Sequence, residues 1–147
     1  MKIKALLSIS ILFSIFWLCS SFHSINHSVV GTWVTYDDET NKAKSHVRIY
    51  QKNDKLYGKI IKLLNVPQNT KCTKCTGHRK NKPLIGMVII NDLTKDGNEW
   101  KNGTVFNPEK NKTYDCKIWL DRENTDKLYV RGYLGFFYKT QTWKRKK

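Results

Sequence analysis

The sequence predicts an all-β domain that closes into an eight-stranded up-and-down antiparallel barrel. Apolar and polar side chains alternate along most segments after residue 28. Turn residues interrupt this alternation about every 8 to 12 residues, as in sandwiches and barrels. Sequential strands usually pair with each other, and an open meander would leave two edges unpaired. About eight consecutive strands joined mostly by short turns therefore favour a closed barrel.

Residues 1–21 have the layout of a secretory signal peptide. Lys2 and Lys4 precede an uncharged apolar stretch over residues 5–18, and small side chains follow up to Ser21. The stretch is shorter than the ~20 residues that span a bilayer. We expect cleavage after Ser21 and export to the periplasm or the medium. The remaining chain then divides into an N-terminal leader over residues 22–28 and a barrel domain over residues 29–147, without a transmembrane segment.

Two alternatives for the N-terminus stay open. The apolar stretch could remain as an uncleaved membrane anchor, or Cys19 could carry a lipid, as in bacterial lipoproteins. Leu18 precedes Cys19, whereas lipoprotein processing prefers a small side chain at that position. Lipid anchoring at Cys19 is therefore the less favoured of the two exported forms.

The first half of the domain contains three predicted strands. Residues 31–36 form the first strand and end in the polar run of residues 37–41. Residues 45–51 and 56–64 form a hairpin about the Asn53-Asp54 turn, because Asn and Asp tolerate the positive φ that tight hairpins need. Residues 65–82 form a long polar loop, and long loops in small domains tend to be functional or tied down.

The second half contains the remaining strands. Residues 84–91 are continuously apolar and read as the most buried strand. Residues 113–121 alternate, with Trp119 on the outer face. The other predicted strands are residues 99–106, 127–134 and 137–145.

Gly31, Trp33 and Arg145 stand at the two ends of the domain in a lipocalin-like arrangement. A Gly-x-Trp opens the first strand, and an arginine lies near the end of the last one. We expect Trp33 to plug one end of the barrel and the Arg145 guanidinium to cover the indole ring by stacking and cation–π attraction. Gly31 would let the entering chain approach closely. All three are predicted to close the barrel, with no catalytic role.

Several further segments, read in order, resemble one family. This sequence is similar to the exported bacterial domain-of-unknown-function family 2147 (DUF2147), whose fold is lipocalin-like (calycin-like). The resemblance implies that fold and an envelope location, with no established reaction. The matching segments are Gly31-Thr32-Trp33, Leu56-Tyr57-Gly58-Lys59-Ile60, Cys72-Thr73-Lys74-Cys75-Thr76-Gly77, Lys82-Pro83-Leu84-Ile85-Gly86-Met87, Asn107-Pro108, Leu128-Tyr129-Val130-Arg131-Gly132-Tyr133-Leu134-Gly135 and Gln141-Thr142-Trp143.

The Cys72-x-x-Cys75 pair in the long loop has several readings. Export permits a local disulfide, which we favour. A redox-active pair would need a helix N-terminus that an all-β chain does not offer. A zinc site could use His78 and would need Cys116 as its fourth ligand, although strand parity turns Cys116 inward. Reduced thiols, or a bond between Cys116 and one of the pair, complete the alternatives.

The chain is strongly basic, with 27 Lys+Arg against 12 Asp+Glu and a formal net charge of +15. This balance favours acidic partners, including an anionic envelope surface. Export argues against nucleic acid as the partner. The sequence contains no nucleophile motif and no inward-facing carboxylate pair, so we expect neither an enzyme nor a bound metal or cofactor.

The predicted function is to bind a small hydrophobic or amphipathic ligand, such as a fatty acid or another lipid, inside the barrel. The alternative is a filled barrel that acts as a structural or interaction protein of the cell envelope through its basic surface. The residues expected to line the binding site are those whose parity turns them inward. They are Val47, Ile49, Leu56, Met87, Ile89, Tyr114, Ile118, Leu128 and Val130.

Overall fold

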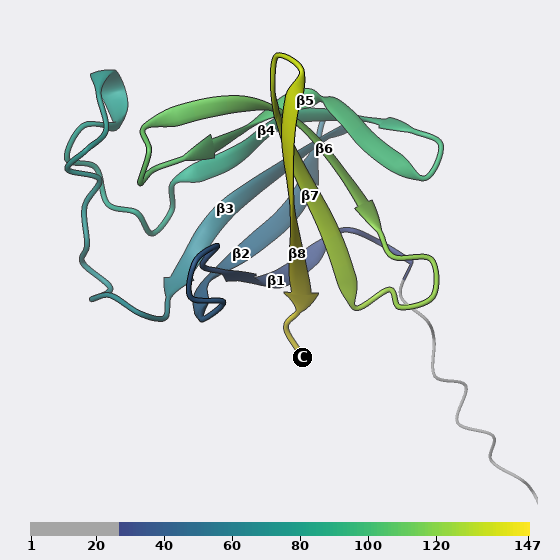
Figure 1. Cartoon of the computed structure of the whole chain (residues 1–147), viewed down its shortest axis with the longest axis horizontal. Coiled ribbons are helices and arrows are strands. Elements are labelled where there is room, and N and C mark those ends of the chain that lie inside the picture. Colours follow the sequence, from purple (N-terminus) through teal and green to yellow (C-terminus); the bar gives the residue numbers. More distant parts are fainter. Residues whose placement is uncertain (1–26) are drawn as a thin grey trace, which may run out of the picture.

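The computed structural model describes residues 27–147 and contains a closed barrel of eight antiparallel strands in the order β1 to β8 (Figure 1). The predicted fold class is confirmed. The predicted signal peptide, Cys19 and residues 22–26 of the leader lie outside the described residues. Within residues 27–147, no helix has the length and hydrophobicity needed to cross a membrane.

The strands follow the order expected from the alternation, with small shifts at their ends. One 3₁₀ turn, η1, lies in the long loop after β3. The elements are β1 (Gly31–Tyr36), β2 (Ala43–Lys52), β3 (Lys55–Leu63), η1 (Gly77–Arg79), β4 (Val88–Asp96), β5 (Glu99–Asn107), β6 (Lys112–Leu120), β7 (Lys127–Leu134) and β8 (Phe137–Arg145).

The β2–β3 hairpin forms about the predicted turn. Asn53 and Asp54 have φ values of 50° and 60°, and Lys52 pairs with Lys55 across them. Two consecutive residues with positive φ are what a type I′ turn requires, and the twist of this turn matches that of the flanking strands. The local sequence therefore sets the register that carries Val47 and Ile49 to the inside.

The strand predicted over residues 84–91 is wrong in its position. β4 begins only at Val88 and runs on to Asp96. Gly86 has a φ of +87°, which an extended strand cannot accommodate, and Pro83 forms only an isolated bridge with Lys71. Leu84 and Ile85, which precede Val88, pack against the core from the loop, and this explains the apolar sequence there without a strand.

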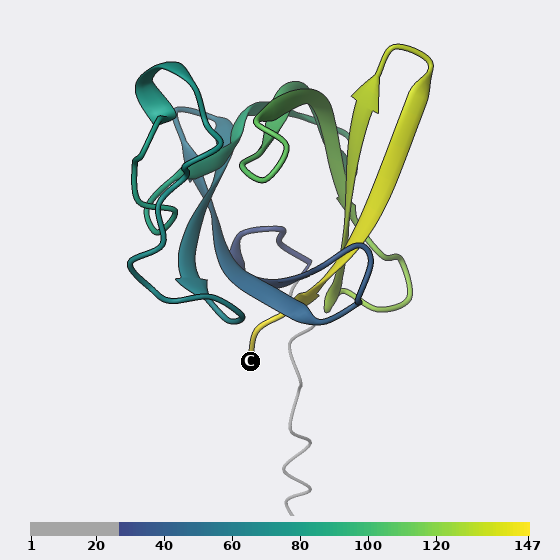
Figure 2. The ribbon, with the colours of Figure 1, turned by 60° about the vertical axis from the view of Figure 1, so that its left-hand side comes forward.

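The barrel has a packed end and an open end. The chain enters and leaves at the packed end, where the β6–β7 turn also lies and where Trp33 is completely buried. The open end carries the β1–β2 turn, the long loop over residues 64–87, and the β5–β6 and β7–β8 turns (Figure 2). Residues whose side chains face inward can therefore lie in the solid core or higher up, near the open end.

The seam between β1 and β8 closes the barrel with few backbone pairs. Trp33 pairs with Arg145, and Val34 pairs with Lys144; no further β1–β8 pair is found in the described chain. The Lys146 amide also donates to the Thr32 carbonyl. All these contacts lie at the packed end, so backbone pairing between the two strands stops well before the open end.

Candidate ligand-binding site

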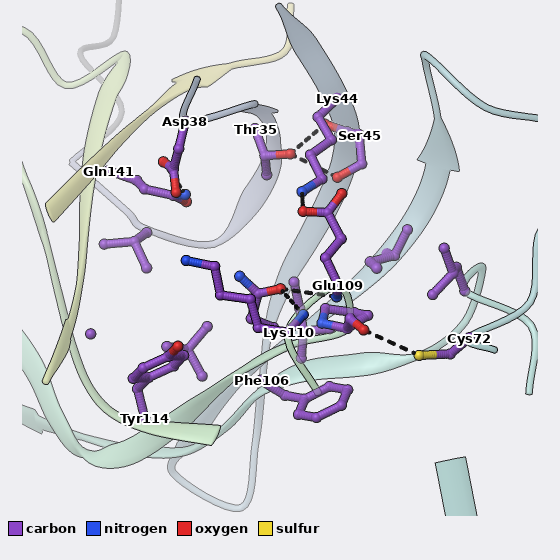
Figure 3. A pocket seen from close by; sticks show the side chains of 18 of the residues that line it. Thr35, Asp38, Lys44, Ser45, Cys72, Phe106, Glu109, Lys110, Tyr114 and Gln141 are labelled. Carbon is purple, nitrogen blue, oxygen red and sulfur yellow. Dashed lines mark hydrogen bonds and ion pairs between the residues drawn. The ribbon is translucent and has the colours of Figure 1, made fainter. Parts of the chain in front are cut away.

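A cavity of about 540 Å³ occupies the open end of the barrel. This volume is within the range of pockets that hold one small molecule. Its walls are mainly apolar and aromatic side chains from seven strands and the long loop, and Figure 3 shows part of this lining. These lining residues include Tyr36, Ile60, Leu63, Val66, Leu84, Ile89, Val105, Phe106, Pro108, Tyr114, Val130, Leu134, Phe137, Tyr138 and Trp143.

Three of the nine residues predicted to contact a ligand line this cavity, namely Ile89, Tyr114 and Val130. The other six do not line it. Strand parity distinguishes the inside of a barrel from the outside, but it does not give the height of a residue along the barrel axis. Five of the six are completely buried in the packed core, and Met87 lies beside a separate hollow near η1. The five are Val47, Ile49, Leu56, Ile118 and Leu128.

The sequence reasoning missed most of the cavity wall. Val105 and Trp143 lie inward on strands that were predicted correctly, and their alternation could have identified them. Gly132 contributes by its lack of a side chain. A Cβ atom there would lie 3.3 Å from Cβ of Tyr114 and 3.6 Å from Cγ1 of Val105. The glycine therefore leaves room for the Tyr114 ring at the cavity wall.

A buried hydroxyl pair forms part of the polar lining. The Oγ atoms of Thr35 and Ser45 are 2.7 Å apart, and both side chains are buried (Figure 3). Thr35 also lies 3.4 Å from the Ser45 carbonyl oxygen. Each hydroxyl satisfies the other, so the pair can stay in the wall without water or ligand.

The charged residues that line the cavity are predominantly lysines. Glu109 accepts an ion pair from Lys44 at 2.6 Å, and Asp38 accepts one from Lys139 at 2.8 Å. The other three lysines that line the cavity form no ion pair within residues 27–147; these are Lys71, Lys74 and Lys110. All three are exposed at the open end, which leaves a positive excess beside an apolar cavity.

Asp38 links the β1–β2 turn to β8 across the part of the seam that lacks backbone pairs. Its Oδ1 accepts a 2.7 Å hydrogen bond from Nε2 of Gln141, and Oε1 of Gln141 accepts one from the Trp143 indole at 3.1 Å. Partial burial raises the pKa of Asp38. Hydrogen bonds from Lys139 and Gln141, and the charges of Lys139 and Lys110, lower it by more, so the pKa is below its usual value.

The cysteine loop lies against the β5–β6 turn at the cavity mouth. Cys72 and Cys75 form a disulfide with their Cα atoms 5.3 Å apart, and Sγ of Cys72 contacts the Pro108 carbonyl oxygen at 3.5 Å (Figure 3). Thr76 and Asn111 exchange two hydrogen bonds, of 3.3 and 3.1 Å. These contacts hold the loop beside the open end.

The bond between Cys72 and Cys75 leaves neither sulfur available as a zinc ligand in this state. His78 is exposed in η1. Cys116 is a free, buried thiol on β6, and desolvation raises its pKa to about 12. No cluster of three or more His, Cys, Asp or Glu side chains suited to a metal was found in the part of the chain that is described.

The packed end is covered by the guanidinium group of Arg145, which lies 4.3 Å from the centre of the Trp33 ring. The indole donates a 2.8 Å hydrogen bond to the Val29 carbonyl. Gly31 has a φ of +146°, and a Cβ atom there would lie only 3.0 Å from Nη1 of Arg145. The glycine therefore provides both the backbone conformation and the space that this cover needs.

A closed eight-stranded barrel, packed at one end and hollow at the other, places this protein in the lipocalin-like class of folds. The chain belongs to the family described as "Uncharacterized protein conserved in bacteria (DUF2147)", which matches residues 31–145. One similar solved structure is the Helicobacter pylori protein HP1028, described as belonging to the lipocalin family. It is 24% identical, with a TM-score of 0.70 over 82% of this chain and 84% of that one. No curated protein matches the chain.

Proposed function

We propose that this protein is an exported binding protein that holds one small amphipathic molecule, with an apolar body and an acidic head, such as a fatty acid. It acts as a carrier or receptor for that molecule rather than as an enzyme. The observation that carries this proposal is the apolar cavity of about 540 Å³ at the open end of the barrel.

The cavity wall fits an apolar body. It is built from inward residues of β3 to β8, with the rings of Tyr114 and Trp143 among them. Aromatic and aliphatic walls favour a ligand that gains by leaving water. The hydroxyl pair of Thr35 and Ser45 is already satisfied internally, so it demands no polar group from the ligand.

The charge at the mouth fits an acidic head. Lys71, Lys74 and Lys110 lie at the open end without an ion-pair partner among the described residues. A carboxylate or phosphate held there would remain partly hydrated while its apolar chain enters the barrel. Such a placement avoids the high cost of burying an unpaired charge.

The alternative function, a filled barrel that serves as a structural protein of the envelope, requires an interior without space. The cavity weighs against that reading. The basic surface that the alternative invoked is compatible with ligand binding, because the same lysines border the cavity.

Native mass spectrometry of protein purified from its own host, followed by lipid extraction, tests the proposal. We expect a co-purifying acidic lipid at one per chain. Val105→Trp is the matched control, because Val105 lines the cavity and the larger ring fills it. This variant should fold and carry no ligand. Repeated preparations without any bound species, together with no binding of a soluble fluorescent fatty acid, would exclude the proposed function.

A further inference from the structure

The exposed large hydrophobic side chains of this protein gather at one end of the barrel. Seven such residues occur within residues 27–147, and only Val30 lies at the packed end. The other six stand at the open end, and four of these six also line the cavity. The six, which we call the apolar rim, are Leu64, Val66, Leu134, Phe136, Phe137 and Tyr138.

The β7–β8 hairpin provides most of the apolar rim. It extends beyond the other strands (Figure 2), and its turn consists of Gly135 and Phe136. Gly135 has a φ of +59°, as the first position of a type II′ turn requires, and Phe136 follows it into solvent. The exposed fractions of Phe136, Phe137 and Tyr138 are 103%, 81% and 61%. Three neighbouring aromatic rings exposed to water at a hairpin tip indicate a binding surface, because contact with an apolar partner would remove them from water.

Positive charge surrounds the same end. Lys71, Lys74 and Lys110 are exposed at the mouth without ion pairs among the described residues, whereas Lys139 beside Tyr138 is paired with Asp38. Exposed apolar side chains with unpaired lysines at the same end match the two layers of an anionic membrane surface, where phosphate groups lie above the acyl chains.

We propose that the open end docks on an anionic lipid bilayer, with Phe136 and its neighbours in the apolar rim inserted at the interface and the mouth lysines on the phosphates. The cavity then opens directly toward the lipid. That the docked protein takes its ligand from, or delivers it to, the bilayer rests on the function proposed above. The docking itself does not require a ligand.

A second copy of the chain is the main competing partner for the apolar rim. Two open ends that met face to face would bring their mouth lysines together, and like charges across an interface oppose association. An anionic bilayer instead attracts those lysines while it covers the rings. The charge distribution therefore favours the membrane.

Sedimentation with lipid vesicles tests the docking. We expect binding to vesicles of phosphatidylcholine mixed with phosphatidylglycerol and weak binding to phosphatidylcholine alone. Phe136→Ser should lower the partition coefficient at least tenfold, while Phe136→Trp should retain binding and show a blue-shifted emission. Val30→Ser is the matched control, because it removes an exposed apolar side chain at the packed end. Equal binding by the wild type and Phe136→Ser would overturn the proposal.

A charge exchange at the two ends tests the electrostatic part. Lys74→Gln with Lys110→Gln removes two charges at the mouth, and Lys52→Gln with Lys95→Gln removes two exposed charges at strand ends near the packed end. Each lysine near an anionic surface changes the partition coefficient by about fivefold. We expect the partition coefficient of the mouth variant to fall by about 25-fold and that of the control variant to change little. Equal losses in both variants would mean that net charge alone governs binding and would contradict this placement.

The docking and the ligand site can fail separately. Val105→Trp fills the cavity and should still bind anionic vesicles, whereas Phe136→Ser should still bind a soluble fluorescent fatty acid, because Phe136 does not line the cavity. Loss of vesicle binding only in Phe136→Ser supports the docking. Light scattering that finds a wild-type dimer, converted by Phe136→Ser to a monomer, would assign the apolar rim to self-association and overturn the proposal.

Discussion

The Arg145 guanidinium lies 4.3 Å above the centre of the Trp33 ring, and the same two residues are backbone partners in the β1–β8 seam. Arg145 also donates to the Ser28 and Thr125 carbonyls, at 2.8 and 3.0 Å, and pairs with Asp126 at 3.3 Å. One side chain therefore joins the leader, the β6–β7 turn and the plug of the barrel.

Arg145→Ala should lower the free energy of unfolding by about 3 kcal/mol, because it removes a desolvated cation–π contact and charge-assisted hydrogen bonds. Arg145→Lys should cost about half of that, since an ammonium group cannot stack or reach several acceptors in one plane. Urea unfolding followed by tryptophan fluorescence measures both. Arg122→Ala, at an exposed position in the β6–β7 turn, is the control and should be near neutral. A near-neutral Arg145→Ala would show that the backbone pairs alone close the seam.

Leu128 and Val130 stand two positions apart on β7 and point inward, yet only Val130 lines the cavity. Leu128→Ala should destabilise the protein by about 3 kcal/mol through the void it leaves in the packed core, with little change in ligand affinity. Val130→Ala should cost less stability, about 1 kcal/mol, and change the Kd for a fluorescent fatty acid several-fold. Denaturation and binding titrations separate the two effects. The reverse ranking in affinity would place the ligand deeper in the barrel.

Much of the fold follows from the sequence, because alternation, turn chemistry and the Gly31–Trp33 motif all indicate the same barrel. The prediction was wrong in the segment before β4, where Leu84 and Ile85 pack from a loop and look like part of a strand. The cavity was harder to place. Alternation turned both Leu128 and Val130 inward, but only the three-dimensional structure shows which height along the barrel is filled.

Asp38 joins the β1–β2 turn to Gln141 and Lys139 on β8, where the seam has no backbone pairs. Asp38→Ala should speed ligand release about twofold to fivefold, as expected for the loss of one partly exposed ion pair. The pKa of Asp38 is lowered, so its contribution is present above the ordinary value of 3.8 and is lost as the pH falls below it. Stopped-flow release at several pH values tests this. A release rate in Asp38→Ala that is unchanged at neutral pH would contradict the link.

Cys116 should be unreactive toward thiol reagents in the folded protein, because burial raises its pKa to about 12. Ellman titration should detect this thiol only after unfolding, in a Cys19→Ser chain that leaves no other free thiol. The same pKa shift makes the free energy of unfolding depend on pH. Folding favours the neutral thiol of Cys116, so its contribution to stability is full below the ordinary pKa of 9.0 and is lost as the pH rises toward 12. Rapid labelling of the native protein at neutral pH would contradict the burial.

The disulfide between Cys72 and Cys75 closes a very short loop, and its stabilisation should be about 2 kcal/mol. Replacing both cysteines by serine should lower stability by that amount and also loosen the loop beside the cavity mouth. Urea unfolding gives the first effect, and hydrogen exchange at the Thr76 backbone amide, which donates to the Asn111 side chain, gives the second. Unchanged exchange at this amide would show that the contacts with the β5–β6 turn hold the loop without the disulfide.

The short backbone seam between β1 and β8 has a consequence for the range of molecules that one barrel can accept. Two residue pairs join β1 and β8 at the packed end, while at the open end Asp38 spans the same gap through side chains alone. Widening the mouth for a bulkier guest then costs a hydrogen bond and an ion pair, and the β-ladders stay intact. The packed end of the barrel is thus held by backbone pairs, whereas the width of the mouth can adjust to the size of the bound molecule.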